Sequence, residues 1–513
     1  MHIELWKVWN LDFAGKQKGK KRKMKKVIII GAGISGMTAG IYLQKAGYET
    51  EIYEKNPLPG GMCTGWMREG FFIDNCIHWL TGSKEGSDLH KLWKEVGALG
   101  EGVELYQKDM FFSAELDGEE ITFWRDKERT RKELLALSPE DAEEIHKLMD
   151  YVKLAESMQV PVKKPFDRMN VVEFMKMGMS MADMGKVMKE YGKMDINDLA
   201  QRFRHPLIRR AIIDYMPPGY QAYAFLVSYA TVTGGNGDIP KGGSLQMALR
   251  MAKKYESLGG KLYTGTEVSK VLVSEKQAEG IELANGERKN AGYVICACDT
   301  SFLFSQLLDV SYMPKGLKKM YDKRTAYPVS SGFQVAFGIT GDSGRLHETG
   351  IFSCRPLVIA ASTAERMSIN AYDYEPGFAP EGCFVAQSNF VQTERDYAYW
   401  MELSKDKEAY TQKKNELAME ALNRFLEQYP EFEGRVGILD VWTPATYDRW
   451  CHAYKGAYMS FVTTKGAKSI TVPGKIKGLS NVFIASQWLM GPGGLPTAAT
   501  MGKFAAQRIT EAR

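Results

Sequence analysis

The sequence of 513 residues has no uninterrupted apolar run close to the roughly 20 residues that a helix needs to cross a bilayer. Any membrane contact would therefore be peripheral. The lysine-rich stretch GKQKGKKRKMKK is not expected to be a secretory signal, because it is followed by no apolar segment other than a short predicted strand.

The chain carries no excess of either charge outside its N-terminus. Residues 1–23 hold seven Lys or Arg and two acids, so 60 residues of each sign remain for the rest. A neutral body argues against nucleic acid as a partner, since a phosphate-binding surface needs excess cations. Two interpretations of the basic segment stay open: a disordered, solvated extension or a weak tether to an anionic surface.

Cysteine is sparse, and its pattern suggests no pairs. The seven cysteines stand at 63, 76, 296, 298, 354, 383 and 451. An odd, scattered set favours a reducing compartment, and we expect a cytoplasmic protein. Cys63 would need a second cysteine a few residues later to form a redox dithiol, and residues 65–75 contain none. No group of residues has the spacing of a metal site, so no metal is predicted.

The chain is too long for one hydrophobic core and should divide into about two or three domains. Its apolar fraction of 44% and its charged fraction of 25% are those of an ordinary globular protein.

A dinucleotide-binding unit opens the folded part. Residues 27–30 form a short apolar run, as expected of a strand buried on both faces, and Gly31, Gly33 and Gly36 then supply G-x-G-x-x-G at the turn into a helix. Gly31 permits the tight turn, Gly33 lets the backbone approach a pyrophosphate, and Gly36 lets the helix pack closely. The phosphates would lie at the helix N-terminus.

The same unit ends in an acid. Gly47 closes the helix, residues 49–53 read as a second strand, and Glu54 stands where this fold places a carboxylate for the ribose hydroxyls. A second glycine pair, Gly60 and Gly61, follows soon after. With this pair the chain resembles the FAD-dependent oxidoreductases of the amine-oxidase superfamily. The resemblance is to the branch of phytoene desaturases, carotenoid isomerases and retinol saturases.

The C-terminal stretch strengthens the resemblance. The strand NVFIAS runs into a glycine turn, and a helix begins near Leu495 and Pro496. In the resembling family this helix points at the pyrimidine end of the flavin, so Gly31 and Gly494 must meet. The family also implies that the backbone of Val268 contacts the adenine.

The resemblance implies FAD as the cofactor and a fold of the α/β class. A Rossmann-type FAD-binding domain, discontinuous in sequence, would join an α+β substrate domain with a mixed sheet and a helical cap. The implied cofactor site consists of Gly31, Ala32, Gly33, Ser35, Gly36, Glu54, Lys55, Gly60, Gly61, Met62, Val268, Gly493, Gly494, Leu495 and Pro496. Met62 departs from the family, where many relatives carry Arg or Ser.

His78 is the candidate catalytic residue. It lies in GFFIDNCIHWL, where relatives have smaller or more apolar residues, and with Trp79 it would place a titratable group beside the flavin. The alternative, a histidine satisfied within the core, stays open.

Domain boundaries follow from changes of pattern. We expect an N-terminal extension (1–23), an FAD-binding domain (24–87, 241–300 and 470–513) and a substrate domain (88–240 and 301–469). In the latter, Asp117-Gly118 marks a hairpin and Ser138-Pro139 opens a helix.

Methionines gather between Met169 and Met194. They suit either ordinary packing or a surface that adapts to an apolar ligand or a bilayer. In the resembling family this insertion is the substrate cap, which leaves a peripheral membrane contact open. Four further residues are candidates for the lining: Trp450, His452, Tyr454 and Tyr458.

The sequence has no second G-x-G-x-x-G unit, so NADPH is not expected, and the electron acceptor or donor stays unknown. Three functions remain. The first is an FAD enzyme that desaturates, saturates or isomerises carbon–carbon bonds of a long hydrophobic molecule. The second is an amine oxidase, which would need an aromatic cage and a cysteine or lysine near the ring, patterns not visible here. The third is a flavoprotein that only binds lipid or a partner.

Overall fold

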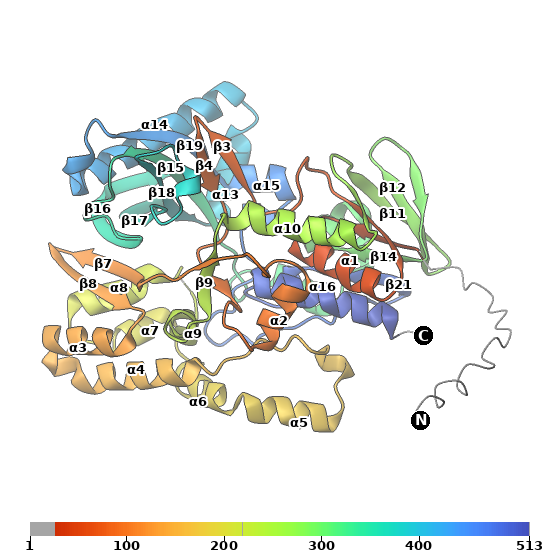
Figure 1. The fold of residues 1–513 in the computed structure, drawn as a ribbon, viewed down its shortest axis with the longest axis horizontal. Helices are drawn as coiled ribbons and strands as arrows, with labels where there is room; N and C mark the ends of the chain where they lie inside the picture. Colours follow the sequence, from red (N-terminus) through yellow and green to blue (C-terminus); the bar gives the residue numbers. More distant parts are fainter. Residues whose placement is uncertain (1–25, 218, 512–513) are drawn as a thin grey trace, which may run out of the picture.

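The computed structural model describes residues 26–217 and 219–511 of the chain. The basic segment 1–23, expected to be a disordered extension, lies outside the described residues. Figure 1 shows two large sheets at opposite ends of the molecule, with a layer of helices along one side of both.

The first sheet has six strands in the order β10-β2-β1-β14-β21-β20, and all neighbours are parallel except β20 and β21. Its strands are β1 (Lys26–Ile30), β2 (Glu49–Tyr53), β10 (Lys261–Tyr263), β14 (Tyr293–Cys296), β20 (Lys475–Ile476) and β21 (Leu479–Ile484). The apolar run predicted for the first strand is buried throughout, as a central parallel strand requires.

Three helices pack beside this sheet: α1 (Ile34–Lys45), α10 (Gly243–Ser257) and α16 (Leu495–Thr510). A Cβ on Gly502 of α16 would lie 2.2 Å from the carbonyl oxygen of Ser35 in α1. The two helices, from opposite ends of the chain, therefore touch backbone to backbone. A small antiparallel sheet of β11 (Val268–Ser274), β12 (Gln277–Leu283) and β13 (Arg288–Asn290) precedes β14.

The second large sheet has seven strands in the order β19-β15-β18-β17-β16-β7-β8 and is mixed, since β7 and β16 are parallel. Its strands are β7 (Met110–Leu116), β8 (Glu119–Trp124), β15 (Ser331–Thr340), β16 (Thr349–Ile359), β17 (Ser362–Ala371), β18 (Cys383–Gln392) and β19 (Val436–Trp442). The hairpin predicted at Asp117-Gly118 is present, with both residues at positive φ. The long helix α14 (Lys407–Gln428) packs on β16 and β19.

A layer of helices lies between β8 and β15 in the chain, that is, between the two parts of the sequence that form the second sheet. It comprises α3 (Lys127–Leu137), α4 (Ala142–Ala155), α5 (Val171–Ser180), α6 (Ala182–Tyr191), α7 (Ile196–Ala200), α8 (Pro206–Tyr215) and α9 (Ala222–Thr233). The prediction of a helix capped by Ser138 was wrong in detail. Residues 139–141 form a 3₁₀ turn, and the Ser138 hydroxyl donates to the Asp141 carboxylate instead of capping a backbone N–H.

Shorter elements connect these parts. They are β3 (Gly65–Arg68), β4 (Phe71–Asp74), β5 (Leu80–Thr81), α2 (Asp88–Glu95), β6 (Leu105–Tyr106), β9 (Gly237–Pro240), α11 (Thr300–Phe302), α12 (Lys315–Asp322), α13 (Glu394–Leu403) and α15 (Pro444–Cys451). The fold is of the α/β class, as predicted, and the division into domains stays a prediction. Among the helices of the described residues, none combines the length and the apolar character needed to span a bilayer.

Candidate functional site

A cavity of about 1330 Å³ begins where β1 and β14 end and continues between the second sheet and the helical layer. Nearly all the residues predicted to bind the cofactor line it: Gly31, Gly33, Ser35, Glu54, Lys55, Gly60, Gly61, Met62, Val268, Gly493, Gly494, Leu495 and Pro496. Ala32 and Gly36 do not. The segments far apart in sequence thus meet at one place, and their contact with a cofactor stays a prediction.

The three glycines of the first turn have different surroundings. A Cβ on Gly31, which has a φ of 99°, would lie 2.7 Å from the carbonyl oxygen of Ala297, and a Cβ on Gly36 would lie 2.0 Å from that of Gly31. A Cβ on Gly33 would meet no atom within 4 Å. Gly31 and Gly36 are therefore needed for packing, whereas Gly33 leaves space in the cavity at the first turn of α1.

Glu54 holds the turn from the neighbouring strand. Its Oε2 accepts the N–H of Ala32 at 2.8 Å, and its Oε1 accepts the N–H of Asn56 at 2.9 Å. The side chain is buried, and this burial raises its pKa although both hydrogen bonds oppose the rise. The Nζ of Lys55 donates to the carbonyl oxygen of Arg449 at 2.7 Å, and its charge also opposes the rise in the pKa of Glu54.

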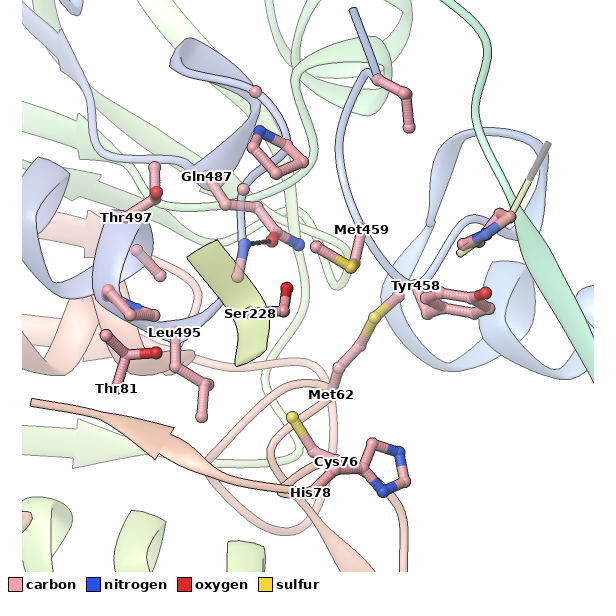
Figure 2. A pocket seen from close by; sticks show the side chains of 18 of the residues that line it. Met62, Cys76, His78, Thr81, Ser228, Tyr458, Met459, Gln487, Leu495 and Thr497 are labelled. Carbon is pink, nitrogen blue, oxygen red and sulfur yellow. Dashed lines mark hydrogen bonds between the residues drawn. The ribbon is translucent and has the colours of Figure 1, made fainter. Parts of the chain in front are cut away.

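The second glycine pair lies directly against the first turn. The N–H of Gly60 donates to the carbonyl oxygen of Ala32 at 2.9 Å, and the indole of Trp450 donates to that of Gly61 at 3.0 Å. The Met62 side chain reaches into the cavity next to Cys76 (Figure 2). Backbone amides and the helix end, not a cation at position 62, are the groups available here for phosphates.

The C-terminal turn closes the opposite wall. Gly493 and Gly494 both have positive φ, and the N–H of Gly494 donates to Oε1 of Gln487 at 2.7 Å. Figure 2 shows Gln487, Leu495 and Thr497 across the cavity from Met62 and His78. The first turn of α16 therefore faces the cavity, as the sequence predicted.

The cradle fits FAD. Space beside Gly33 at the N-terminus of α1 suits a pyrophosphate, and the buried Glu54 carboxylate suits ribose hydroxyls. Asp299, which the sequence did not single out, lines the same region after β14. Burial raises the pKa of Asp299 to about 7, although it accepts the N–H groups of Tyr454, Ser301 and Phe302. An acid three residues after the end of a strand of this sheet was the signal that could have found it.

His78 is not satisfied within the core. The exposed surface of its side chain faces the cavity, and protein atoms surround the ring on its other sides. Burial, together with the charge of Lys108, lowers the pKa of His78 to about 4. The imidazole is neutral at pH 7. Trp79 also lines the cavity and packs edge-on against Phe111, with ring centroids 6.4 Å apart.

The structure brings Cys76 opposite Cys63. In the β3–β4 hairpin Gly65 pairs with Asp74, and just beyond the strands the N–H of Asn75 donates to the carbonyl oxygen of Thr64 at 3.0 Å. The same register places Cys76 opposite Cys63. Cys76 lies one residue beyond the segment 65–75, in which no second cysteine was expected. A redox role remains disfavoured, because the neighbouring Cys76 thiol and burial raise the pKa of Cys63 well above its usual range.

Beyond the cradle the cavity is largely apolar. Its wall in the helical layer is formed by Met158, Met181, Met184, Met188, Ile196, Ile213, Met216, Tyr220 and Val227. Trp450, His452 and Tyr458 line the cavity as expected. Tyr454 does not: its ring packs edge-on against Tyr321. Lys108 also lines the cavity, and the sequence offered no signal for it beyond its place before an apolar strand.

Comparison with known proteins gives the family. Residues 34–510 match the family described as flavin containing amine oxidoreductase. The chain is 24% identical over 292 residues to a lycopene-forming phytoene desaturase of Paracoccus sp., covering 55% of this chain and 56% of that protein. It is 22% identical to a chloroplastic prolycopene isomerase of an Oncidium hybrid cultivar, covering 97% and 86%.

The alignment with the desaturase thus spans only about half of that protein's length. Among solved structures, an oxidoreductase from Methanosarcina mazei has the same fold, with a TM-score of 0.58, 19% identity, and coverage of 94% of this chain and 99% of that one. The chain belongs to the flavin containing amine oxidoreductase family, with FAD as its cofactor.

Proposed function

We propose that the protein acts on carbon–carbon bonds of a long, apolar, polyene-like molecule, by desaturation, saturation or isomerisation. The observation that carries this proposal is the continuity of the cavity from the glycine cradle into a wall of methionines and aliphatic side chains. Its volume of about 1330 Å³ exceeds the roughly 300–1,000 Å³ typical of a site for one small ligand, which suits a dinucleotide together with a second molecule.

The named activities of the relatives support the same class. They include a phytoene desaturase and a prolycopene isomerase, both named for polyene substrates. FAD bound in the cradle would supply the ring that takes up or returns a hydride. The chain itself would hold the substrate in a water-poor space lined by flexible thioethers that adapt to its shape.

His78 is the residue of this chain best placed to handle a proton. A neutral imidazole can accept a proton at a ring nitrogen, and the ring faces the cavity on the wall of Met62 and Cys76 (Figure 2). With a pKa of about 4, His78 is a weak base. A group that neutralises the positive charge near the ring would raise this pKa and make His78 a stronger base.

The methionine-rich cap also suits contact with a membrane surface. Helix α5 buries none of its residues, and Val171, Phe174, Met175 and Met179 are all more than half exposed. Figure 1 shows α5 and α6 along the lower edge of the molecule, at the outside of the helical layer. Because α6 lines the cavity with Met184 and Met188, we propose that an apolar substrate passes from a bilayer into the cavity past these helices.

Anaerobic reduction of the purified FAD-loaded protein tests the proposed function. Loss of the flavin absorbance near 450 nm on adding a polyene supports it, whereas loss on adding amines but not polyenes indicates an amine oxidase. An amine oxidase would need an aromatic cage of two rings that face each other. The Tyr447 and Tyr458 rings instead meet at 66° with centroids 6.4 Å apart, which does not favour amines as substrates. If no polyene changes the flavin spectrum or is isomerised, the proposal fails.

A further inference from the structure

Lys108 is a buried cation in the wall of a largely apolar cavity. It lies between β6 and β7, its exposed fraction is 8%, and its Nζ donates to Oγ1 of Thr349 at 3.1 Å. Within residues 26–217 and 219–511, no carboxylate oxygen lies within 4 Å of this nitrogen. The ammonium therefore retains donors that a single hydroxyl does not satisfy.

The other cations of this wall have carboxylate partners. Arg366 contacts Asp214 at 2.6 Å, and Arg210 contacts the same carboxylate at 2.7 Å. One carboxylate thus serves two guanidinium groups. Glu365 also lines the cavity, so Arg210, Arg366, Asp214 and Glu365 carry two charges of each sign before Lys108 is counted.

Two groups near Lys108 bear on its charge. Burial lowers the pKa of Lys108, and the charge of Glu348 opposes this. One oxygen of the Glu348 carboxylate accepts the hydroxyl of Tyr106, and the other is buried with no hydrogen-bond partner among the described residues. The neutral His78 ring is the second neighbour, and the positive charge of Lys108 disfavours its protonation. Neither group supplies a direct counter-ion, and burying an uncompensated ammonium is strongly unfavourable.

Thr349 and Asn370 lie next to Lys108, and Asn370 adds hydrogen-bond donors for a ligand that accepts hydrogen bonds. The Thr349 hydroxyl donates to Oδ1 of Asn370 at 3.1 Å, which leaves the amide hydrogens of Asn370 as donors on the same wall. An ammonium and an amide at one place, with an apolar space beyond them, fit a ligand that ends in an anionic oxygen group and continues as hydrocarbon.

We propose that Lys108 binds the carboxylate of the substrate, so that the natural ligand is a long apolar carboxylic acid and not a pure hydrocarbon. The inference rests on the proposed function for the apolar part of the cavity. A carboxylate on Lys108 would neutralise the charge next to His78 and raise the pKa of that imidazole. Binding of the acid would thereby turn a weak base into a stronger one.

Three ligands with one skeleton test the inference on the FAD-loaded full chain: all-trans-retinoic acid, its methyl ester and the hydrocarbon axerophthene. Dissociation constants are measured by equilibrium dialysis, independently of activity. We expect the acid to bind at least tenfold more tightly than the ester. In Lys108→Met the acid should lose at least tenfold in affinity while the ester is unchanged, and Lys108→Arg should retain part of the preference.

Lys241→Met is the control, because this exposed lysine pairs with Glu104 and does not line the cavity. If Lys108→Met does not fold, the ratio of acid to ester in the wild-type protein still decides. Equal binding of acid and ester, or a preference for the hydrocarbon, overturns the inference and leaves the proposed function standing. Absence of binding by all three ligands overturns both.

Discussion

The N–H of Ala32 donates to the carboxylate of Glu54 at 2.8 Å, so the acid at the end of β2 fixes the glycine turn at the end of β1. The carboxylate was predicted to bind ribose, and it also lies in the cavity wall. One side chain would thus both shape the cradle and contact its ligand.

Replacing Glu54 should release FAD. Glu54→Ala removes the acceptor of two backbone N–H groups, and we expect about tenfold or more weaker retention, in line with the roughly 1.5–3 kcal/mol of hydrogen bonds to charged groups. The ratio of absorbance at 450 and 280 nm after dialysis measures it. Glu49→Gln is the control, since Glu49 pairs with Lys261 and does not line the cavity. A fully yellow Glu54→Ala protein would contradict the assignment.

Two glycines of the turn should respond differently to alanine. Gly36→Ala places a Cβ 2.0 Å from the carbonyl oxygen of Gly31, and overpacking of this kind costs about 1–3 kcal/mol, so the Tm of the apoprotein should fall by several degrees. Gly33→Ala meets no atom and should leave that Tm nearly unchanged while weakening FAD binding. Calorimetry of the two apoproteins and FAD titration separate the effects. Equal losses of Tm would refute the distinction.

His78 should remain neutral down to about pH 4. Its pKa lies below that of an unfolded histidine because of burial first and Lys108 second. Between pH 6.5 and 4 the unfolded chain binds a proton that the folded one refuses, so stability falls as the pH falls through this window. His78→Gln should flatten this part of the stability curve.

The charge of Lys108 should be visible in the titration of His78. We expect Lys108→Met to raise the pKa of His78 from about 4, but not to its ordinary value, because burial remains. NMR of ¹³C-labelled histidine rings, assigned with His78→Gln, measures the shift. An unchanged titration would show that the two side chains do not interact.

Cys63 should be slow to react. Its thiol donates to the carbonyl oxygen of Ser244 at 3.3 Å, and its raised pKa leaves little thiolate at pH 8. Alkylation with iodoacetamide followed by peptide mass spectrometry should label the half-buried Cys383 well before Cys63. Rapid labelling of Cys63, or a disulfide with Cys76 in the isolated protein, would reopen a redox role.

The apolar surface of α5 should govern binding to lipid vesicles. A triple variant, Phe174→Ser, Met175→Ser and Met179→Ser, should lose most flotation with vesicles of mixed neutral and anionic lipids, because it removes exposed apolar area. Val358→Ser, another exposed apolar residue but on β16, serves as control. If the wild-type protein does not float, the membrane contact is refuted.

The glycine segments that meet in the cavity could be assigned from the sequence because their signals are local. A glycine at a strand end or a proline in a first helical turn acts on its immediate neighbours, so Gly31 and Pro496 could be assigned without a fold. Lys108 and Asp214 could not be found this way, since their partners Thr349 and Arg366 lie 241 and 152 residues away in the chain. Cys76 shows an intermediate case: it becomes the partner of Cys63 only through the register of a hairpin.

The contact of α1 with α16 has a consequence for biogenesis. The wall formed by Gly493 and Gly494 and the helix after it are synthesised long after the turn that they face. The nascent chain must therefore keep its first helix soluble and unpartnered while the residues between the two are made.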